Sequence, residues 1–333
     1  MSIEQGIRAT AKTWRSYWFT PSTAESLGLA RIVCFFACFA IYLRLDDRGW
    51  TQISPVFWMP ISVFRLLPGP PHDPIVIGVL QAIWKLSLIT SALGLLTRFS
   101  LIVAAVLGFF LLGLPNCFGK IHHLDGFPVL LLLIFALSRC GDAFALDRVL
   151  WRRRNMSAEP SGEYTWPVRL GQALFLLIFF AAGFSKIRHS GFAWMTADNM
   201  RFLLLGNLFI HEPWTRLGTL IVQSDALCFF GAVATVAVEL SALLALFFQR
   251  LRFPFLFGIF GMQTCITLFL GIYFTPHLIG YLLFFSWERI HRRLRISLIN
   301  SPTGQLRVGD LMKTCKQSFQ RIRADRLTGR QGN

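Results

Sequence analysis

The residue whose position most suggests chemistry is Lys186, which ends an apolar run that begins at Leu170. An amine at such a boundary either snorkels to the membrane surface or serves as a base in a poorly solvated pocket. Desolvation lowers the pKa of an amine from about 10.4 and frees its lone pair at neutral pH. Gly183 and Ser185 would let a ligand approach closely. From the residues alone, the anchor and the base both remain open.

Two adjacent histidines, His122 and His123, stand just before another apolar run and are followed by Asp125. Neighbours on a helix point about 100° apart and rarely chelate one metal together. No cysteine or histidine set with zinc spacing accompanies them, so no metal is predicted. One of the two histidines could act as an acid, a base or a hydrogen-bond donor. His277, beside Pro276, is expected to be an interfacial cap.

Three charged residues fall inside apolar runs, where a charge is costly: Arg31, Lys85 and Glu239. The structural interpretation is that Lys85 or Arg31 pairs with Glu239 and fixes the packing of helices. The functional alternative is that Glu239 orients a catalytic amine. Both interpretations remain open at this stage.

The composition excludes an ordinary soluble domain. Of 333 residues, 54% are hydrophobic and only 15% are charged, whereas soluble proteins carry about a quarter charged residues. The mean hydropathy is +0.54. The 33 Phe and 10 Trp suit helices that face lipid and its interface. The first 25 residues are polar and mildly basic, and no signal peptide is evident there. The seven cysteines imply no disulfide, because those in apolar runs can act as small hydrophobes.

The distribution of apolar runs predicts an all-α polytopic bundle with about eight transmembrane helices. A span needs about 20 apolar residues. Eight runs approach that length: 27–43, 74–95, 100–114, 126–137, 168–184, 226–248, 253–273 and 276–287. The third, fourth and eighth are short, so each is a tilted span or a re-entrant segment. Two further runs, 53–67 and 192–209, are interrupted by proline, glycine or charge and are predicted to be interfacial helices.

The positive charge follows the expected topology. The net charge is +16, and eleven Lys and Arg residues lie after residue 288. With both termini in the cytoplasm, every cytoplasmic segment obeys the positive-inside rule, and Lys186 and the two histidines lie at the outer face. Attraction to anionic membrane lipid is a secondary role for this charge. No nucleic-acid motif accompanies it, so nucleic-acid binding is not expected. The predicted organisation is a cytoplasmic segment 1–25, a transmembrane domain 26–288 and a basic cytoplasmic tail 289–333.

Short motifs occur along the chain in a fixed order. They are Arg31, Gly94-Leu-Leu-Thr-Arg98-Phe-Ser, Gly119-Lys-Ile-His-His123, Asp142 with Ala145-Leu-Asp147, Trp166-Pro-Val-Arg169-Leu-Gly-Gln172, and Ala182-Gly183-Phe-Ser-Lys186 followed by Trp194 and Met200. Over roughly residues 20–290 this ordered set resembles the HTTM membrane domain. That family includes vitamin K-dependent gamma-carboxylase and many bacterial relatives that stand alone.

The resemblance implies a carboxylase-like membrane enzyme. Lys186 would be the base that deprotonates vitamin K hydroquinone or another quinol, with CO2 and O2 as co-substrates, and His123 would support the developing oxyanion. The resemblance further implies a bacterial inner-membrane location and an active site at the outer face. The residues expected to bind substrate or to support the site are Arg31, Arg169, Gln172, Trp194 and Glu239.

The chain also departs from the animal carboxylases. A basic tail, expected to be cytoplasmic, follows the last apolar run where those enzymes carry a large extra-membrane region, and Ala197 stands where the family has a glycine. We therefore interpret the chain first as an enzyme whose substrate is a lipophilic small molecule or a peptide. The alternative is a non-enzymatic membrane partner in maturation or export of a secreted peptide. A transporter is less favoured, because no repeated pair of broken helices is present. The sequence sets no expectation for the oligomeric state.

Overall fold

The computed structural model describes residues 14–119, 123–151, 159–210 and 216–300, and this part of the chain is helical apart from its connecting segments. The chain forms two compact units, Met1–Phe285 and Ser286–Asn333. The second unit contains α14 (Trp287–Asn300), which begins the basic tail. The expectations for residues 301–333 lie outside the described residues.

Five helical stretches among the described residues are long and apolar enough to cross a membrane. They are α2 (Ala24–Tyr42), α3 (Pro74–Leu93), α4 (Thr97–Gly113) extended by η4 (Leu114–Phe118), α7 (Trp166–Ser190) with its flanking turns, and α12 (Arg252–Leu270). They coincide with five of the eight predicted runs. The third run was expected to be short, but η4 lengthens it to a stretch of 22 residues.

The other three predicted spans are shorter or interrupted. The fourth is α5 (Gly126–Leu137), which has 12 residues. The sixth is divided into α10 (Asp225–Ser241) and α11 (Leu244–Phe247). The eighth is a 3-10 turn, η8 (Thr275–His277), followed by the five-residue α13 (Leu278–Leu282). The prediction of about eight spans therefore has support for five only.

Short turns and helices occupy the two runs predicted to be interfacial. Residues 48–66 form η1 (Arg48–Gln52), η2 (Pro55–Phe57) and η3 (Ser62–Leu66), because prolines in this stretch prevent a longer helix. The second run forms η7 (Gly191–Met195) and α8 (Ala197–Ile210). Other short elements of the first unit are a helical stretch at 14–19, η5 (His123–Asp125), α6 (Leu146–Leu150), η6 (Gly162–Tyr164) and α9 (Gly218–Ile221).

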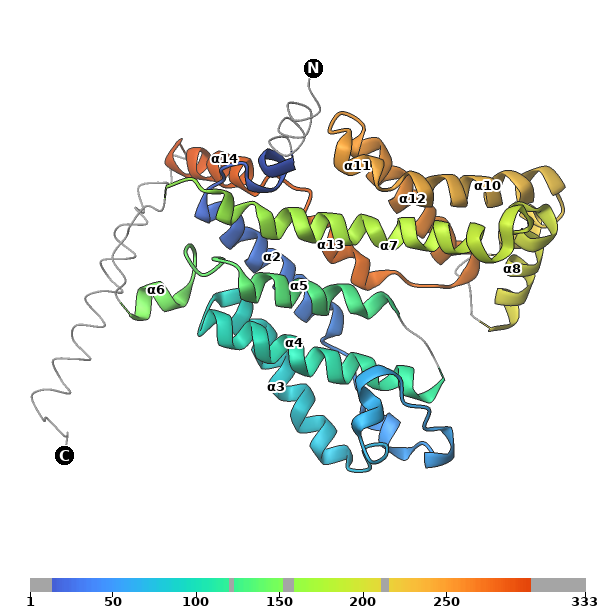
Figure 1. Cartoon of the computed structure of the whole chain (residues 1–333), viewed down its shortest axis with the longest axis horizontal. Helices are drawn as coiled ribbons and strands as arrows, with labels where there is room; N and C mark the ends of the chain where they lie inside the picture. Colours follow the sequence, from blue (N-terminus) through green and yellow to red (C-terminus); the bar gives the residue numbers. More distant parts are fainter. Residues whose placement is uncertain (1–13, 120–122, 152–158, 211–215, 301–333) are drawn as a thin grey trace, which may run out of the picture. The chain divides into compact units, whose positions relative to one another are not determined.

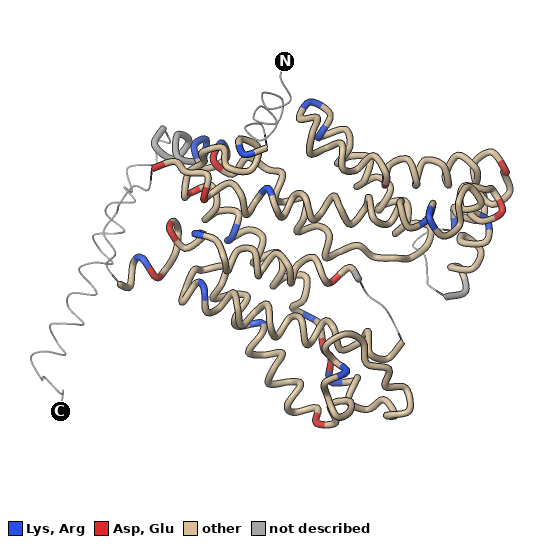
Figure 2. The backbone as a smooth tube through the Cα atoms, viewed as in Figure 1, with Lys and Arg blue, Asp and Glu red and all other residues tan. Residues whose placement is uncertain are grey.

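Within the first unit the helices pack mainly on their neighbours in sequence. α2, α3, α4 and α5 form successive pairs, and α7 packs on α5 and on α10 (Figure 1). α13 contacts both α2 and α7. The core holds large apolar side chains such as Trp84, Phe135 and Phe175. The surface of the same helices exposes Phe99, Phe257 and others. Figure 2 shows charged residues mostly in turns and at helix ends, as lipid-facing helices require.

Buried Arg31 fastens one end of this bundle. Its guanidinium donates to the carbonyl oxygens of Cys140 at 2.6 Å and Phe144 at 2.7 Å, in the segment that follows α5. Asp147, from the same segment, accepts from the backbone N–H of Thr97 at 2.8 Å and so caps the first turn of α4. Gly94 makes the preceding turn at φ 71. Arg31 and the Gly94 and Asp147 motifs thus form one structural contact.

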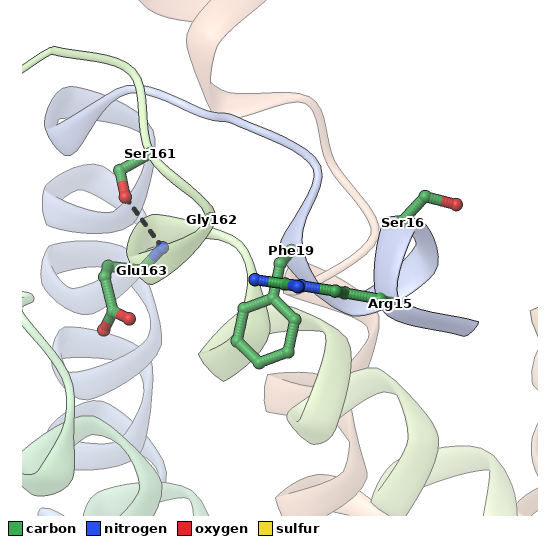
Figure 3. A pocket seen from close by; sticks show the side chains of 6 residues that line it. All are labelled: Arg15, Ser16, Phe19, Ser161, Gly162 and Glu163. Atoms are coloured by element: carbon green, nitrogen blue, oxygen red, sulfur yellow. Dashed lines mark hydrogen bonds between the residues drawn. The ribbon is translucent and has the colours of Figure 1, made fainter. Parts of the chain in front are cut away.

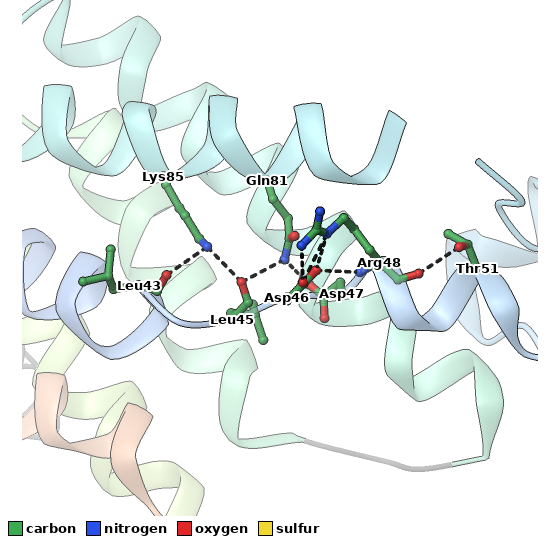
Figure 4. Close-up of polar contacts among 8 residues, drawn as sticks. All are labelled: Leu43, Leu45, Asp46, Asp47, Arg48, Thr51, Gln81 and Lys85. Atoms are coloured by element: carbon green, nitrogen blue, oxygen red, sulfur yellow. Dashed lines mark hydrogen bonds and ion pairs between the residues drawn. The ribbon is translucent and has the colours of Figure 1, made fainter. Parts of the chain in front are cut away.

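Lys85 has a structural role as well. Its ammonium donates to the carbonyl oxygens of Leu43 at 3.0 Å and Leu45 at 2.8 Å, just beyond the C-terminal end of α2 (Figure 4). Carbonyls at this end of a helix lack intrahelical partners and favour a cation. The predicted pairing of Lys85 or Arg31 with Glu239 is therefore wrong, because both cations bind backbone carbonyls.

Candidate functional site

Glu239 pairs with Lys186. The ammonium of Lys186 bonds both carboxylate oxygens of Glu239, Oε1 and Oε2, the latter at 2.5 Å. Lys186 Nζ also lies 4.6 Å from the centre of the Trp194 ring. The Glu239 side chain is 6% exposed and that of Lys186 is 22% exposed. The carboxylate is thus buried beneath an amine that remains reachable from outside the protein.

Helix packing places the two charged groups. Lys186 lies near the C-terminal end of α7 and Glu239 near that of α10, and the two helices pack together. A Cβ at Gly183 would lie 2.8 Å from Glu239 Cβ and 3.1 Å from the backbone N of Leu240. Gly183 therefore allows α7 and α10 to approach each other closely. The sequence had suggested instead that this glycine makes room for a ligand.

A reversal of the chain after α7 brings the ring of Trp194 to the amine of Lys186. Gly191, at φ 55, ends α7 in a conformation that glycine adopts easily. The following turn, η7, packs on α7 and α10. This return of the chain places the Trp194 ring against the amine, within the range of a cation–π interaction. Neither sequence interpretation of Lys186 describes this arrangement fully, because the amine is at a helix end and is also held by a carboxylate.

Two further predicted site residues lie far from Lys186 along the same helix. Arg169 and Gln172 belong to the first turns of α7, roughly 25 and 20 Å away by the helical rise. Gln172 Nε2 donates to the carbonyl of Leu283 at 2.8 Å and so ties α7 to the segment after α13. Arg31, described above, fastens the segment after α5. The structure brings together Lys186, Glu239 and Trp194 from the predicted set.

The two predicted histidines lie at the gap in the described residues between 119 and 123. His122 and the side chain of His123 lie outside the described residues, so His123 stays a prediction. The backbone of η5 packs against η8. Asp125, in η5, accepts a hydrogen bond from the Tyr42 hydroxyl at 2.5 Å. This carboxyl therefore joins η5 to α2.

The sequence-based predictions did not include a buried polar network around His277. His277 is 2% exposed, and its ring contacts Phe175 and Phe179 of α7, so it is not an interfacial cap. The Tyr281 hydroxyl donates to Gln263 Oε1 at 2.8 Å, and Gln263 Nε2 lies 2.7 Å from His277 Nδ1. Because the Gln263 amide oxygen accepts from Tyr281, its amide nitrogen is the group that faces His277 Nδ1. A glutamine inside the seventh apolar run was the sequence signal.

A surface pocket of about 520 Å³ lies at the opposite end of α7. It is lined by residues of the N-terminal segment and the turn before α7: Arg15, Ser16, Phe19, Ser161, Gly162 and Glu163 (Figure 3). Arg15 and Glu163 give it one charge of each sign. This pocket does not reach Lys186, which is near the other end of the helix. Among the described residues, no group of three or more His, Cys, Asp or Glu side chains could hold a metal ion.

The fold and the site define an all-helical protein. Its described segments include five helices long and apolar enough to cross a membrane, and a lysine–glutamate pair joins two packed helices. No protein-family model, no curated protein and no solved structure matches the chain.

Proposed function

We propose that this chain is a carboxylase-like integral membrane enzyme of the HTTM type, with Lys186 and Glu239 as its proton-transfer pair. One observation carries the proposal: a buried carboxylate holds a partly exposed amine beneath an aromatic ring. In this proposal α5, the α10–α11 pair and the η8–α13 segment complete eight crossings of a bacterial inner membrane. Both termini are cytoplasmic and Lys186 faces outward, as the distribution of Lys and Arg favours.

The pair can serve as a base only through its carboxylate. At rest the ammonium and carboxylate stabilise one another. A lipophilic substrate over Lys186 excludes water, which disfavours both charges and moves one proton from Lys186 Nζ to Glu239. The neutral amine then accepts the proton of a substrate hydroxyl. The net step moves the hydroxyl proton to Glu239, and the re-formed ammonium faces the new oxyanion.

The surroundings of the pair suit a quinol. The Trp194 ring offers a flat aromatic face at the amine, and Phe192 is exposed two residues before it on η7. Aromatic rings of this kind stack on a quinol ring. When bound, vitamin K hydroquinone or another quinol would supply the reducing power that, with O2, drives addition of CO2. The protein residues hold the ring and move the proton.

Membranes that contain the protein provide the test. Hydroquinone, O2 and labelled bicarbonate are added, and the epoxide and the fixed label are measured. Lys186→Ala should lower product formation about 100-fold or more, because general-base catalysis contributes at least that much. Arg188→Ala, an exposed cation one half-turn later, is the matched control and should behave as wild type. No product from wild type, or equal product from Lys186→Ala, contradicts the quinol proposal.

A second candidate is a non-enzymatic partner in the maturation or export of a secreted peptide. It is favoured by the 520 Å³ pocket, which lies away from the pair, and by the pair's mutual hydrogen bonding, which suits a helix lock. Co-expression with a secreted peptide precursor tests it. Full maturation of the peptide by Lys186→Ala supports the partner role. If Lys186→Ala abolishes maturation and Arg188→Ala does not, the result supports the enzyme instead.

A further inference from the structure

A cluster of cations lies at the end of α7 opposite Lys186. The Arg169 guanidinium is 5.0 Å from the centre of the Tyr17 ring, which belongs to the short helix before α2. Arg252, the first residue of α12, lies close enough to both residues to interact electrostatically. Three segments that are distant in sequence thus place two like charges and a phenol together.

The described residues do not balance this charge. Arg169 Nη1 donates to Gln172 Oε1 at 3.3 Å, and Arg252 Nε donates to the Ala245 carbonyl at 3.2 Å. Neither arginine is in an ion pair with a described carboxylate. Arg252 Nη2 and the Tyr17 hydroxyl are shielded from solvent without a hydrogen-bond partner. Shielded polar groups of this kind are unfavourable unless something binds them.

The helix ends increase the imbalance. Arg169 and Arg252 both lie in the first turn of a long helix, and the first turns of α7 and α12 contain no acidic residue. The N-terminal end of a helix carries partial positive charge and stabilises anions. Two arginines at two such ends are unfavourable by themselves. An anion between them would satisfy the guanidinium donors and both helix ends.

We infer that Arg169, Arg252 and Tyr17 form a binding site for a phosphate group, and that a membrane phospholipid supplies it. Guanidinium groups bind phosphate oxygens in bidentate geometry, and the phenol offers one more donor. The neighbouring aromatic residues Trp14 and Phe19 are exposed, and exposed aromatic side chains are typical of helix ends at the depth of lipid headgroups.

A plain topological role does not account for the same observations. Arginines that only set orientation extend their heads into water. Here Arg252 Nη2 is shielded, and so is the hydroxyl of Tyr17. The neighbouring pocket of Figure 3 is less suited to an anion, because Glu163 faces it together with Arg15. The cluster of Arg169, Arg252 and Tyr17 is a basic site between helices, of the kind that binds lipid phosphates.

The test uses the full chain, purified in detergent and stripped of lipid. Phosphatidylglycerol, phosphatidylcholine, a phosphate-free glucosyl diacylglycerol and inorganic phosphate are titrated separately. Binding is followed by native mass spectrometry and by the rise in melting temperature. Both phospholipids should bind and the glycolipid should not. Equal affinity for inorganic phosphate would assign the anion site to free phosphate and overturn the lipid as its source.

Variants locate the site. Arg169→Gln with Arg252→Gln should weaken phospholipid binding about tenfold or more, and Arg250→Gln, a neighbouring exposed arginine, should leave it unchanged. Tyr17→Phe keeps the ring under Arg169 and removes the hydroxyl, so it tests the site even if the double variant fails to fold. Equal binding of the glycolipid, or unchanged phospholipid binding by Tyr17→Phe and the double variant, overturns the inference.

Discussion

At the scale of single residues, the partner decides what a buried charge can do. Lys85 donates to the carbonyls of Leu43 and Leu45, and Lys186 donates to the carboxylate of Glu239. A backbone carbonyl cannot take up a proton, so it cannot serve as the proton acceptor of Lys85. A carboxylate can take up a proton, so only Lys186 can become a neutral amine through its partner. This difference makes Lys186 the chemical candidate of the two.

Removing the carboxylate should therefore affect both turnover and stability. Glu239→Gln deprives Lys186 of its proton acceptor, and we expect about 100-fold lower hydroquinone turnover. It also leaves a partly buried ammonium without its counter-charge, at a cost of about 1–3 kcal/mol in unfolding free energy. Asp225→Asn, which alters an exposed carboxylate of the same helix, is the control. Equal behaviour of the two variants in turnover and thermal denaturation would refute this role of Glu239.

A second residue-scale prediction concerns pH. Burial raises the pKa of Asp47 to about 6 from its usual value of 3.8, with the hydrogen bond from Gln81 opposing the rise. Because the folded state binds this proton more tightly, its contribution is fully present below about pH 4. That contribution is lost as the pH rises through 6, and it amounts to about 3 kcal/mol at most.

Melting temperatures between pH 4 and 8 measure this effect. Asp47→Asn should remove the decrease in stability between pH 4 and 6, because an amide does not titrate. Asp46→Asn is the control, since the pKa of the exposed Asp46 is lowered to about 2 by its hydrogen bonds with Arg48. An unchanged slope in Asp47→Asn would contradict this assignment.

At the scale of elements, the sequence predicted continuous helices well and interrupted ones poorly. The run at 74–95 became α3 within two residues, because its apolar residues continue from a proline start to a glycine end. The run at 276–287 did not become one continuous helix, because only η8 and the five-residue α13 form there. Chain direction there depends on Gly271, at φ 67, and on burial of His277 against α7. Contacts of that kind come from other segments and leave no periodic signal.

The α7–α10 contact gives the element-scale prediction. Gly183→Ala places a methyl group 3.1 Å from the backbone of Leu240, which cannot yield as a flexible side chain would. The helices should separate, and stability should fall by about 1–3 kcal/mol, with a parallel loss of turnover. Gly261→Ala is the matched control in α12, because nothing lies within 4 Å of its new methyl group. Thermal denaturation that ranks the two variants equally would show that the contact is not tight.

At the scale of the whole molecule, composition predicted the structural class of the protein, and helix packing determined the arrangement of Lys186, Glu239 and Trp194. The high apolar content predicted an all-helical protein with membrane-crossing helices, and five helices in the described part of the chain are long and apolar enough to cross a membrane. Lys186 and Glu239 were each notable as charges at or in apolar runs. The sequence offered Glu239 either as a partner of Lys85 or Arg31 or as the residue that orients a catalytic amine. It could not decide between these, because 53 residues separate Glu239 from Lys186 and only the packing of α7 on α10 joins them. Trp194 entered the predicted site through the family resemblance.

The prediction at this scale concerns which side of the membrane Lys186 and the C-terminal tail face. Alkaline phosphatase, which is active only outside the cytoplasm, can be fused after Ser190 or after Arg250. The excess of Lys and Arg predicts an active fusion at Ser190 and an inactive one at Arg250. A fusion after Asn333 should also be inactive. The reverse pattern would place Lys186 in the cytoplasm and contradict the outward-facing site.

Exchange of the two charges tests the central claim most directly. Lys186→Glu combined with Glu239→Lys restores an ion pair between α7 and α10 but moves the amine away from the outer position. If the pair performs proton transfer, the double exchange should recover the melting temperature lost by either single change and remain about 100-fold below wild type in hydroquinone turnover. Recovery of both stability and turnover would contradict the account and reduce the pair to a helix lock.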